Sequence, residues 1–405
     1  MRTIICLLIT TFTLQILAID WPQWRGPNRD GVNTENDLLD QWPEGGPKLA
    51  WKSEGVGGGY SSVVTSKGVI YTLGDLEDAC YLIALDTNGK HLWKAKVGEP
   101  GGHRGYPGPR STPTVDNGNV YVLGQQGDLV CFDIATKKET WRRNLARDFG
   151  GRMMSGWRWS ESPLVDGKQI VVTPGGDDGA VIALNKENGT QVWRTKDFTD
   201  RAGYSSIIIR EIGKKRQYLQ LTGNSVVGID TTDGSLLWKA PRAGRTAVVT
   251  TPIFHEDTLF VTSSYGVGCN GFRVTAAGEK FEAKQLYAHK TISNHHGGCI
   301  RVGSYVYGSS GNTLACIDLK TGKTQWSERS AGKGAIIVAD GKIILRTERG
   351  PVSLVKLNPD EYEEVSRFNQ PDRTRRRAWS HPVVSNGILY LKDQDTLFAY
   401  DIKED

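Results

Sequence analysis

The chain has 405 residues, with 50 lysine and arginine residues against 45 aspartate and glutamate residues. This near balance gives a formal net charge of +5 and does not suggest a nucleic-acid-binding protein. The one dense basic run, residues 373–377, is local, and the 48 glycines are expected of a chain that turns every few residues.

The first 18 residues have the pattern of a secretory signal peptide. Arg2 precedes an apolar run from Ile4 to Leu17, and Ala18 offers a cleavage site. We therefore predict a signal peptide over residues 1–18 and a periplasmic or secreted protein. No cysteine follows the apolar run as an acceptor for lipid, and no other stretch is long enough to span a bilayer. We expect neither a lipid anchor nor a membrane span.

Residues 19–47 are rich in tryptophan, proline and glycine. We interpret them as an extended N-terminal arm that wraps on the body of the protein. Trp21, Trp24 and Trp42 are its expected anchors, because a buried indole contributes a large apolar area.

Residues 48–405 repeat one pattern. In one copy an apolar run ends at Asp230, Gly234 follows four residues later, and Trp238 follows four residues after that. This predicts a strand, a tight turn in which the carboxylate accepts backbone N–H groups and glycine supplies positive φ, and a second strand. The tryptophans are expected to pack between neighbouring repeats. The aspartates and tryptophans of the pattern are Asp86, Asp133, Asp230, Asp318 and Asp401, and Trp51, Trp93, Trp141, Trp193, Trp238 and Trp326.

Eight short strands open the repeats, most of them after a Ser/Thr-Pro or Ser-Ser signal, the last after His381-Pro382. Two repeats without a tryptophan are expected around residues 271–274 and 354–358. Four-stranded units at a period of about 45 residues predict an all-β, eight-bladed β-propeller with antiparallel blades. The last repeat stops before its tryptophan strand, and residues 48–54 supply such a strand around Trp51, so we predict that the two ends share one blade.

Five cysteines follow the apolar leader: Cys80, Cys131, Cys269, Cys299 and Cys316. An odd number leaves at least one unpaired in an exported protein, and the pairing of the others is open. Cys131 and Cys316 occupy a slot that holds alanine in other repeats, which indicates small buried residues.

The Ala-Leu-Asp-x-x-x-Gly-x-x-x-Trp pattern, with Ser-Pro-x-Val before the blades, resembles the pyrroloquinoline-quinone-like (PQQ-like) repeat family. That family includes quinoprotein alcohol dehydrogenases and non-enzymatic, BamB-like outer-membrane assembly lipoproteins. The resemblance implies eight blades and an exported propeller, and it does not by itself imply an enzyme. The chain lacks the adjacent cysteine pair of the dehydrogenases and the N-terminal lipid-anchoring cysteine of the BamB-like proteins.

The loops before the innermost strands are rich in arginine, tryptophan and histidine, unlike ordinary hairpin loops. Cations and aromatic rings converging on one axis can bind an anionic or aromatic ligand, and the alternative is that they plug the funnel. The candidate ligand-binding residues are Arg110, Trp157, Trp159, Glu161, Tyr204, Arg245, His295, His296, Trp379 and His381.

No catalytic residue is assigned. Glu161 is a candidate general base or Ca²⁺ ligand. His295 and His296 are adjacent but have no third ligand in the sequence, so we expect no metal site.

Our leading hypothesis is a non-enzymatic binding or scaffold module of the cell envelope, with an envelope protein or peptide as partner and no cofactor. One alternative is a short PQQ-dependent oxidoreductase, with PQQ and Ca²⁺ bound beside Trp157, Trp159 or Trp379. Another is a carbohydrate-binding propeller in which the same tryptophans stack on sugar rings.

Overall fold

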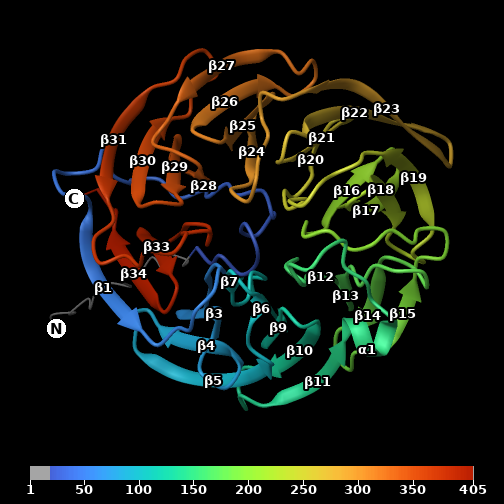
Figure 1. Cartoon of the computed structure of the whole chain (residues 1–405), viewed down its shortest axis with the longest axis horizontal. Coiled ribbons are helices and arrows are strands. Elements are labelled where there is room, and N and C mark those ends of the chain that lie inside the picture. Colours follow the sequence, from blue (N-terminus) through green and yellow to red (C-terminus); the bar gives the residue numbers. More distant parts are fainter. Residues whose placement is uncertain (1–18, 405) are drawn as a thin grey trace, which may run out of the picture.

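The computed structural model describes residues 19–404, so the predicted signal peptide lies outside the described residues. Over this range eight sheets, each of four antiparallel strands, stand radially around one axis (Figure 1). This confirms the predicted eight-bladed propeller. None of the helical structure between residues 19 and 404 is long and apolar enough to cross a membrane.

The first seven blades each consist of four strands that follow one another in the chain, with the first strand nearest the axis. Blades 1 to 4 contain β2 (Val64–Ser66), β3 (Val69–Asp75), β4 (Cys80–Asp86) and β5 (His91–Gly98); β8 (Thr114–Asp116), β9 (Asn119–Leu123), β10 (Asp128–Asp133) and β11 (Glu139–Asn144); β12 (Leu164–Asp166), β13 (Gln169–Val172), β14 (Ile182–Asn185) and β15 (Gln191–Arg194); and β16 (Ile208–Ile212), β17 (Lys215–Leu221), β18 (Ser225–Asp230) and β19 (Leu236–Pro241).

Blades 5 to 7 include the two repeats that lack the tryptophan. They contain β20 (Ile253–His255), β21 (Thr258–Ser263), β22 (Gly268–Ala277) and β23 (Lys280–His289); β24 (Cys299–Val302), β25 (Tyr305–Ser310), β26 (Thr313–Asp318) and β27 (Thr324–Arg329); and β28 (Gly334–Ala339), β29 (Lys342–Thr347), β30 (Pro351–Lys356) and β31 (Glu364–Asn369). The expected hidden repeats therefore exist, at β22 and β30. A two-stranded hairpin, β6 (Gly102–His103) and β7 (Tyr106–Pro107), and a short helix, α1 (Leu145–Phe149), complete the elements outside the blades.

The eighth blade joins the two ends of the chain, as predicted. Its strands are β32 (Val383–Ser385), β33 (Ile388–Asp393), β34 (Thr396–Asp401) and, at the outer edge, β1 (Lys48–Glu54). β1 runs antiparallel to β34, and the register places Trp51 opposite Ala399. The ring is thus closed by backbone hydrogen bonds between segments almost 350 residues apart.

Three of the motif tryptophans pack on the glycine turn of the next blade, namely Trp51 on Gly89, Trp141 on Gly189 and Trp193 on Gly234. A Cβ atom on Gly189 of blade 3 would lie 2.6 Å from the ring of Trp141 of blade 2. The indole Nε1 of Trp141 donates to the carbonyl of Lys186 at 2.9 Å, and Trp51 donates to the carbonyl of Thr87 at 2.8 Å. The indole therefore fixes both the separation and the register of adjacent blades.

The two junctions that blade 5 makes with its neighbours differ from this contact. Blade 5 carries Tyr287 where the others have tryptophan, and its hydroxyl donates to the carbonyl of Leu319 at 2.7 Å while its ring covers Gly322. Trp238 faces blade 5, which lacks the motif turn, and its Nε1 donates to Gln217 Oε1 of its own blade at 2.8 Å. Tyr287 was missed in the sequence because only tryptophan was sought at that position.

The motif aspartates organise the turns as predicted. Asp86 Oδ1 accepts the N–H groups of Asn88 and Lys90, both at 2.9 Å. Asp318 Oδ1 accepts the N–H of Thr321 at 2.7 Å. These turns hold the glycine at positive φ, where the neighbouring indole covers it.

The Ser/Thr signals before the blades form a ring of hydrogen bonds around the axis. The N–H of Thr112 donates to Ser162 Oγ at 2.9 Å, and the N–H of Ser162 donates to Ser206 Oγ at 2.9 Å. Across the junction of the two chain ends, the N–H of His381 donates to Ser62 Oγ at 2.8 Å. Each blade thus positions the loop of its neighbour, and the inner loops (the loops leading into the first strand of each blade) have defined positions.

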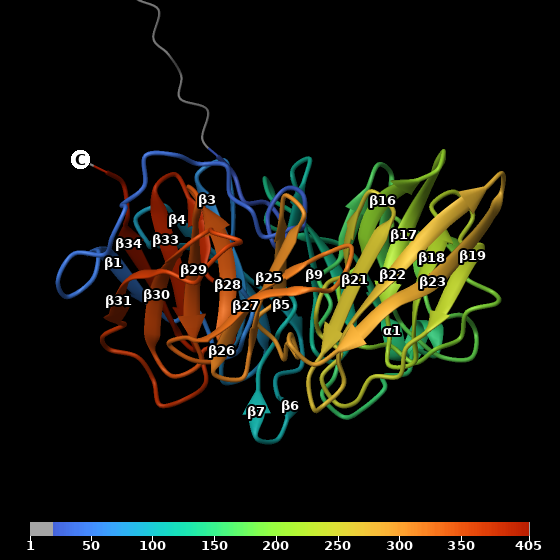
Figure 2. The ribbon, with the colours of Figure 1, turned by 90° about the horizontal axis from the view of Figure 1, so that it is seen from above.

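Residues 19–47 cross one face of the ring, opposite the face that carries β6 and β7 (Figure 2). Trp21 is buried and exchanges backbone hydrogen bonds with Thr65, and Trp42 packs edge-on against Phe368. The buried guanidinium of Arg29 donates to the carbonyls of Ser162 and Pro163. This segment closes one end of the central channel.

All five cysteines within the described range are buried and unpaired. Cys131 and Cys316 lie in the strands that precede the motif turn, with 1% and 0% of their surface exposed, as the alanine slot predicts. Burial raises the pKa of the Cys131 thiol to about 11, which makes it a poor nucleophile.

The inter-blade contact predicts a measurable difference between two glycines of blade 3. Gly189 and Gly167 both have positive φ, but Gly189 touches Trp141 whereas nothing lies within 4 Å of a Cβ on Gly167. We expect Gly189→Ala to lower the free energy of unfolding by about 1–3 kcal/mol more than Gly167→Ala, because it adds overpacking to the same backbone strain. Denaturant unfolding of both variants measures this, and equal losses would contradict the wedge role of the indole.

Candidate functional site

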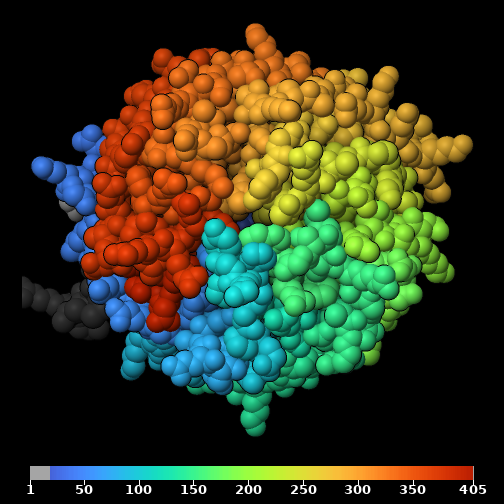
Figure 3. Space-filling model, in the orientation of Figure 1, coloured from blue at the N-terminus to red at the C-terminus, as the bar shows by residue number. Residues whose placement is uncertain are grey.

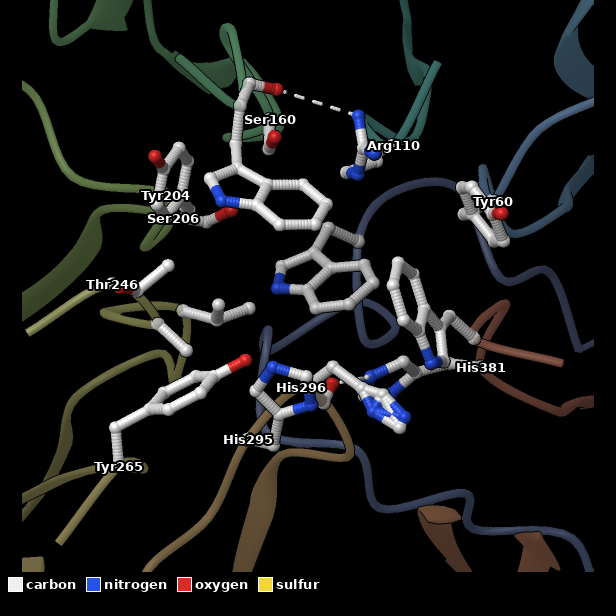
Figure 4. A pocket seen from close by; sticks show the side chains of 15 residues that line it. Tyr60, Arg110, Ser160, Tyr204, Ser206, Thr246, Tyr265, His295, His296 and His381 are labelled. Carbon is white, nitrogen blue, oxygen red and sulfur yellow. Dashed lines mark hydrogen bonds between the residues drawn. The ribbon is translucent and has the colours of Figure 1, made fainter. Parts of the chain in front are cut away.

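A pocket lies on the propeller axis between the N-terminal arm and the β6–β7 hairpin (Figure 4). The space between its side chains, with the open solvent at its mouth included, is about 780 Å³. Trp24 of the arm contributes to it, with its indole donating to Thr251 Oγ1 at 3.0 Å and its ring 4.5 Å from the ring of His381. The other lining residues come mainly from the inner loops of several blades.

Equivalent positions of the inner loops supply about half of the pocket lining. In most blades the side chain that reaches the pocket comes two residues before the Ser, Thr, Gly or His that opens the blade. These side chains are Tyr60, Arg110, Ser160, Tyr204, Val249, His296 and Trp379. The corresponding residue in blade 7 is Gly332, which has no side chain to contribute.

The β6–β7 hairpin covers part of the pocket with aromatic rings. His103 stacks on Trp157 with ring centroids 3.7 Å apart and planes 8° apart. Tyr106 stacks on Trp379 with centroids 4.7 Å apart. Figure 3 shows this face of the molecule, with the hairpin in cyan beside the axis. One face of each tryptophan is therefore occupied by the protein's own rings.

Arg110 organises this cover. Its guanidinium donates to the carbonyls of Tyr106, Gly108 and Trp157. It also lies over the rings of Tyr60 and Trp157, with its Cζ 5.3 and 5.5 Å from the ring centroids. Burial lowers the pKa of Arg110 below its usual value, which still leaves the group cationic.

Three histidines line the opposite wall. Burial lowers the pKa of His295 to about 4 and that of His381 to about 3, and it holds the pKa of His296 well below its usual value. All three imidazoles are therefore neutral near pH 7. Tyr265, half exposed at the mouth, packs edge-on against His295 with centroids 5.4 Å apart.

The structure brings together most of the residues named from the sequence. Arg110, Trp157, Tyr204, His295, His296, Trp379 and His381 line the pocket. Trp159, Glu161 and Arg245 do not line it. Whether any of them binds a ligand stays a prediction.

The three residues outside the pocket have other surroundings. Trp159 is buried in the core between blades 2 and 3, where its ring covers Gly127. Glu161 is buried behind the inner strands, where its carboxylate accepts the N–H of Thr173 and an amide N–H of Gln220. Arg245 is exposed in the loop between β19 and β20.

Some lining residues were not found from the sequence. Tyr60 and Tyr265 lie in stretches that contain no neighbouring arginine or histidine. Aligning the eight blade openings and taking the residue two positions before each would have found Tyr60. Tyr265 lies in the β21–β22 turn and Trp24 in the arm, so no loop rule identifies them.

The fold and site define an eight-bladed propeller with a preformed axial pocket, and comparison with known proteins gives its family. The family model described as "Outer membrane protein assembly factor BamB" matches residues 80–328, more than half of the chain. The chain belongs to this family.

A curated relative and two solved structures are similar to it. BamB of Burkholderia pseudomallei is 27% identical over 227 residues, which are 54% of this chain and 55% of the relative. The match thus spans about half the length of that relative. The crystal structure of BamB from Moraxella catarrhalis superposes with a TM-score of 0.56 at 15% identity, covering 84% of this chain and 99% of that chain. Quinohemoprotein alcohol dehydrogenase from Comamonas testosteroni gives a TM-score of 0.65 at 14% identity, covering 94% and 80%. At these identities the structural similarity shows the fold alone.

Two neighbouring tryptophans should respond differently to truncation. Trp159→Ala empties a buried core site and is expected to cost about 3–5 kcal/mol of unfolding free energy. Trp157→Ala opens a wall of the pocket instead and is expected to cost about 1 kcal/mol. Equilibrium unfolding of the two variants measures the difference, and similar losses would show that Trp157 is a core residue too.

The burial of Glu161 predicts a pH dependence of stability. Burial raises its pKa from 4.5 to about 7 in the folded protein, so its contribution to stability is fully present below pH 4.5 and is lost as the pH rises through 7. The unfolding free energy of the wild type, relative to Glu161→Gln, should therefore fall by about 3 kcal/mol over this window. Denaturant unfolding at a series of pH values tests this, and parallel profiles for the two proteins would refute it.

Proposed function

We propose that this protein is a non-enzymatic binding module of the cell envelope, and that its axial pocket receives an aromatic or apolar side chain of a partner polypeptide. The observation that carries this proposal is the preformed aromatic pocket on the propeller axis, held between the arm and the hairpin. Membership in a family described by an outer membrane assembly factor supports an envelope role for the module.

The chemistry of the walls favours an aromatic or apolar group. The aromatic rings that line the pocket are those of Trp24, Tyr60, Trp157, Tyr204, Tyr265 and Trp379, while the guanidinium of Arg110 is already bonded to three carbonyls. Aromatic side chains pair edge-to-face or offset with such rings and bring a large apolar area out of water. A partner side chain inserted here would act as the anchor of a wider contact across this face of the propeller.

The alternative of a quinoprotein is disfavoured by the residues present. PQQ carries three carboxylates, and Arg110 is the one lysine or arginine among the described residues that line the pocket. The lining contains no aspartate or glutamate, and Glu348 beside it offers a single carboxylate, whereas Ca²⁺ takes about six to eight oxygen ligands. The residues therefore do not fit PQQ with Ca²⁺. Binding of a sugar is disfavoured because the pocket lining presents mainly apolar surface, whereas sugar hydroxyls need several polar partners.

The binding role can be tested with a photoreactive side chain placed at Tyr265, which is 50% exposed at the pocket mouth. Val192 is equally exposed on the outer strand of blade 3, far from the axis, and provides a matched control position. On irradiation of living cells we expect a defined adduct with an envelope polypeptide from position 265, and none from position 192. Adding Trp157→Ala, which removes a wall of the pocket, should reduce the adduct strongly. Equal adducts from both positions, or no effect of Trp157→Ala, would contradict the proposal.

Ligand titrations of the purified protein test the two alternative functions. Titration with PQQ and Ca²⁺, followed by absorbance and melting temperature, should give no saturable change. Saturable binding with reduction of a dye by alcohols or sugars would overturn the non-enzymatic assignment. Titration with oligosaccharides, followed by tryptophan fluorescence, tests the carbohydrate alternative in the same way.

A further inference from the structure

Three potential metal ligands meet at the wall of the pocket formed by blades 6 and 7. His295 and His296 lie in the loop between β23 and β24, and Glu348 follows β29, about fifty residues later in the chain. One ligand atom from each lies within 4.8 Å of the others. His296 Nε2 is 3.3 Å from Glu348 Oε1. The sequence could not supply this third ligand because Glu348 is not in an inner loop.

Three of the four histidine nitrogens at this point make no hydrogen bond within the described part of the chain. Nδ1 and Nε2 of His296 and Nδ1 of His295 are buried and make no hydrogen bond. The side chain of His296 keeps only 10% of its surface exposed. Buried polar atoms in native proteins nearly always have a bonding partner. Three nitrogens without a hydrogen bond at one place therefore indicate a partner that the chain itself does not supply.

The carboxylate is held in place by neighbouring donors. Trp379 Nε1 donates to Glu348 Oε1 at 2.8 Å, and Lys333 Nζ lies 3.0 Å from the same oxygen. Arg377 lies 3.7 Å from Oε2. The side chain of Lys333 is 30% exposed and flexible, so it can leave the carboxylate when another cation arrives.

We propose that His295, His296 and Glu348 bind a divalent first-row transition metal ion, with Zn²⁺ as the representative ion and Lys333 as the cation that it displaces. Two imidazole nitrogens and one carboxylate oxygen are a ligand set of zinc sites that keep an open fourth position. Ca²⁺ and Mg²⁺ are disfavoured, because they prefer oxygen ligands only. Tetrahedral coordination with bonds of about 2.1 Å needs ligand atoms about 3.4 Å apart. The His296–Glu348 pair already meets this separation, and the widest pair must close by roughly 1.4 Å.

The open position would face the pocket. His295 and His296 line the pocket, and the ring of Trp379 packs edge-on against both. The fourth ligand is therefore water or an oxygen donor of whatever occupies the pocket. The metal site stands on its own ligands and does not depend on the proposed polypeptide partner.

The test is metal binding by protein purified without a histidine tag and stripped with a chelator. Isothermal titration with Zn²⁺ should give one site per chain, and Co²⁺ at the same site should give the intense visible absorption of four-coordinate cobalt. Glu348→Gln should weaken binding by more than about tenfold, because the carboxamide keeps the shape of the side chain but removes its charge. Lys333→Met should strengthen it, since the competing ammonium is gone.

The exposed pair His255 and Glu256, 3.9 Å apart, provides the matched control. His255→Ala should leave the stoichiometry and affinity unchanged, and circular dichroism shows whether each variant is folded. The proposal is overturned if the folded wild type binds no Zn²⁺, if binding survives Glu348→Gln, if His255→Ala removes it, or if Lys333→Met weakens it.

Discussion

The structure depends on the packing of one indole on one glycine turn. At three blade junctions a tryptophan lies across the glycine of the next blade, and Trp51 and Trp141 also donate to a carbonyl of that turn. A side chain on the glycine would enter the ring, and a smaller residue in place of tryptophan would leave the turn carbonyl unpaired. The same contact thus fixes the distance between sheets by packing and their register by hydrogen bonding. Tyr287 keeps both features with a different ring, which shows that the contact, not the residue type, is required.

The pocket is a consequence of this regular spacing. Because the blades stand at fixed angles and their opening hydroxyls bond to the next blade, equivalent residues of different inner loops arrive at equivalent places around the axis. A side chain two residues before each opening then points to a common centre. The arm closes one end of that centre through Trp24, and the β6–β7 hairpin covers part of the other. The outer strands of each repeat carry the contacts that stabilise the ring. The residues of the inner loops are therefore free to differ from blade to blade.

The sequence predicted most of the fold because short sequence patterns determine its strands and turns. The Asp-to-Trp spacing defines strands and turns within a dozen residues, and the missing final tryptophan strand led to the pairing of β1 with β34. The site was predicted less well because it depends on which side chains turn inward. Trp157 and Trp159 are two residues apart in one loop, yet Trp157 lines the pocket while Trp159 fills the core. Glu348 and Trp24 reach the site from a strand end and from the arm, and only the closed ring brings them beside the inner loops.

The distribution of charge around the axis supports the proposed binding role of this propeller. Buried charges are bonded to the backbone: Arg25 donates to the carbonyl of Cys299, Arg29 to that of Pro163 just before β12, and Arg346 to that of Lys392. A charge used in this way stabilises the channel and is not available to a substrate. What lines the pocket is a set of aromatic rings and neutral imidazoles, and the buried Glu348 beside it is paired with Lys333. Such a surface selects a ligand by shape and stacking. A metal ion bound at His295 and His296 would add a stronger, directional contact to it.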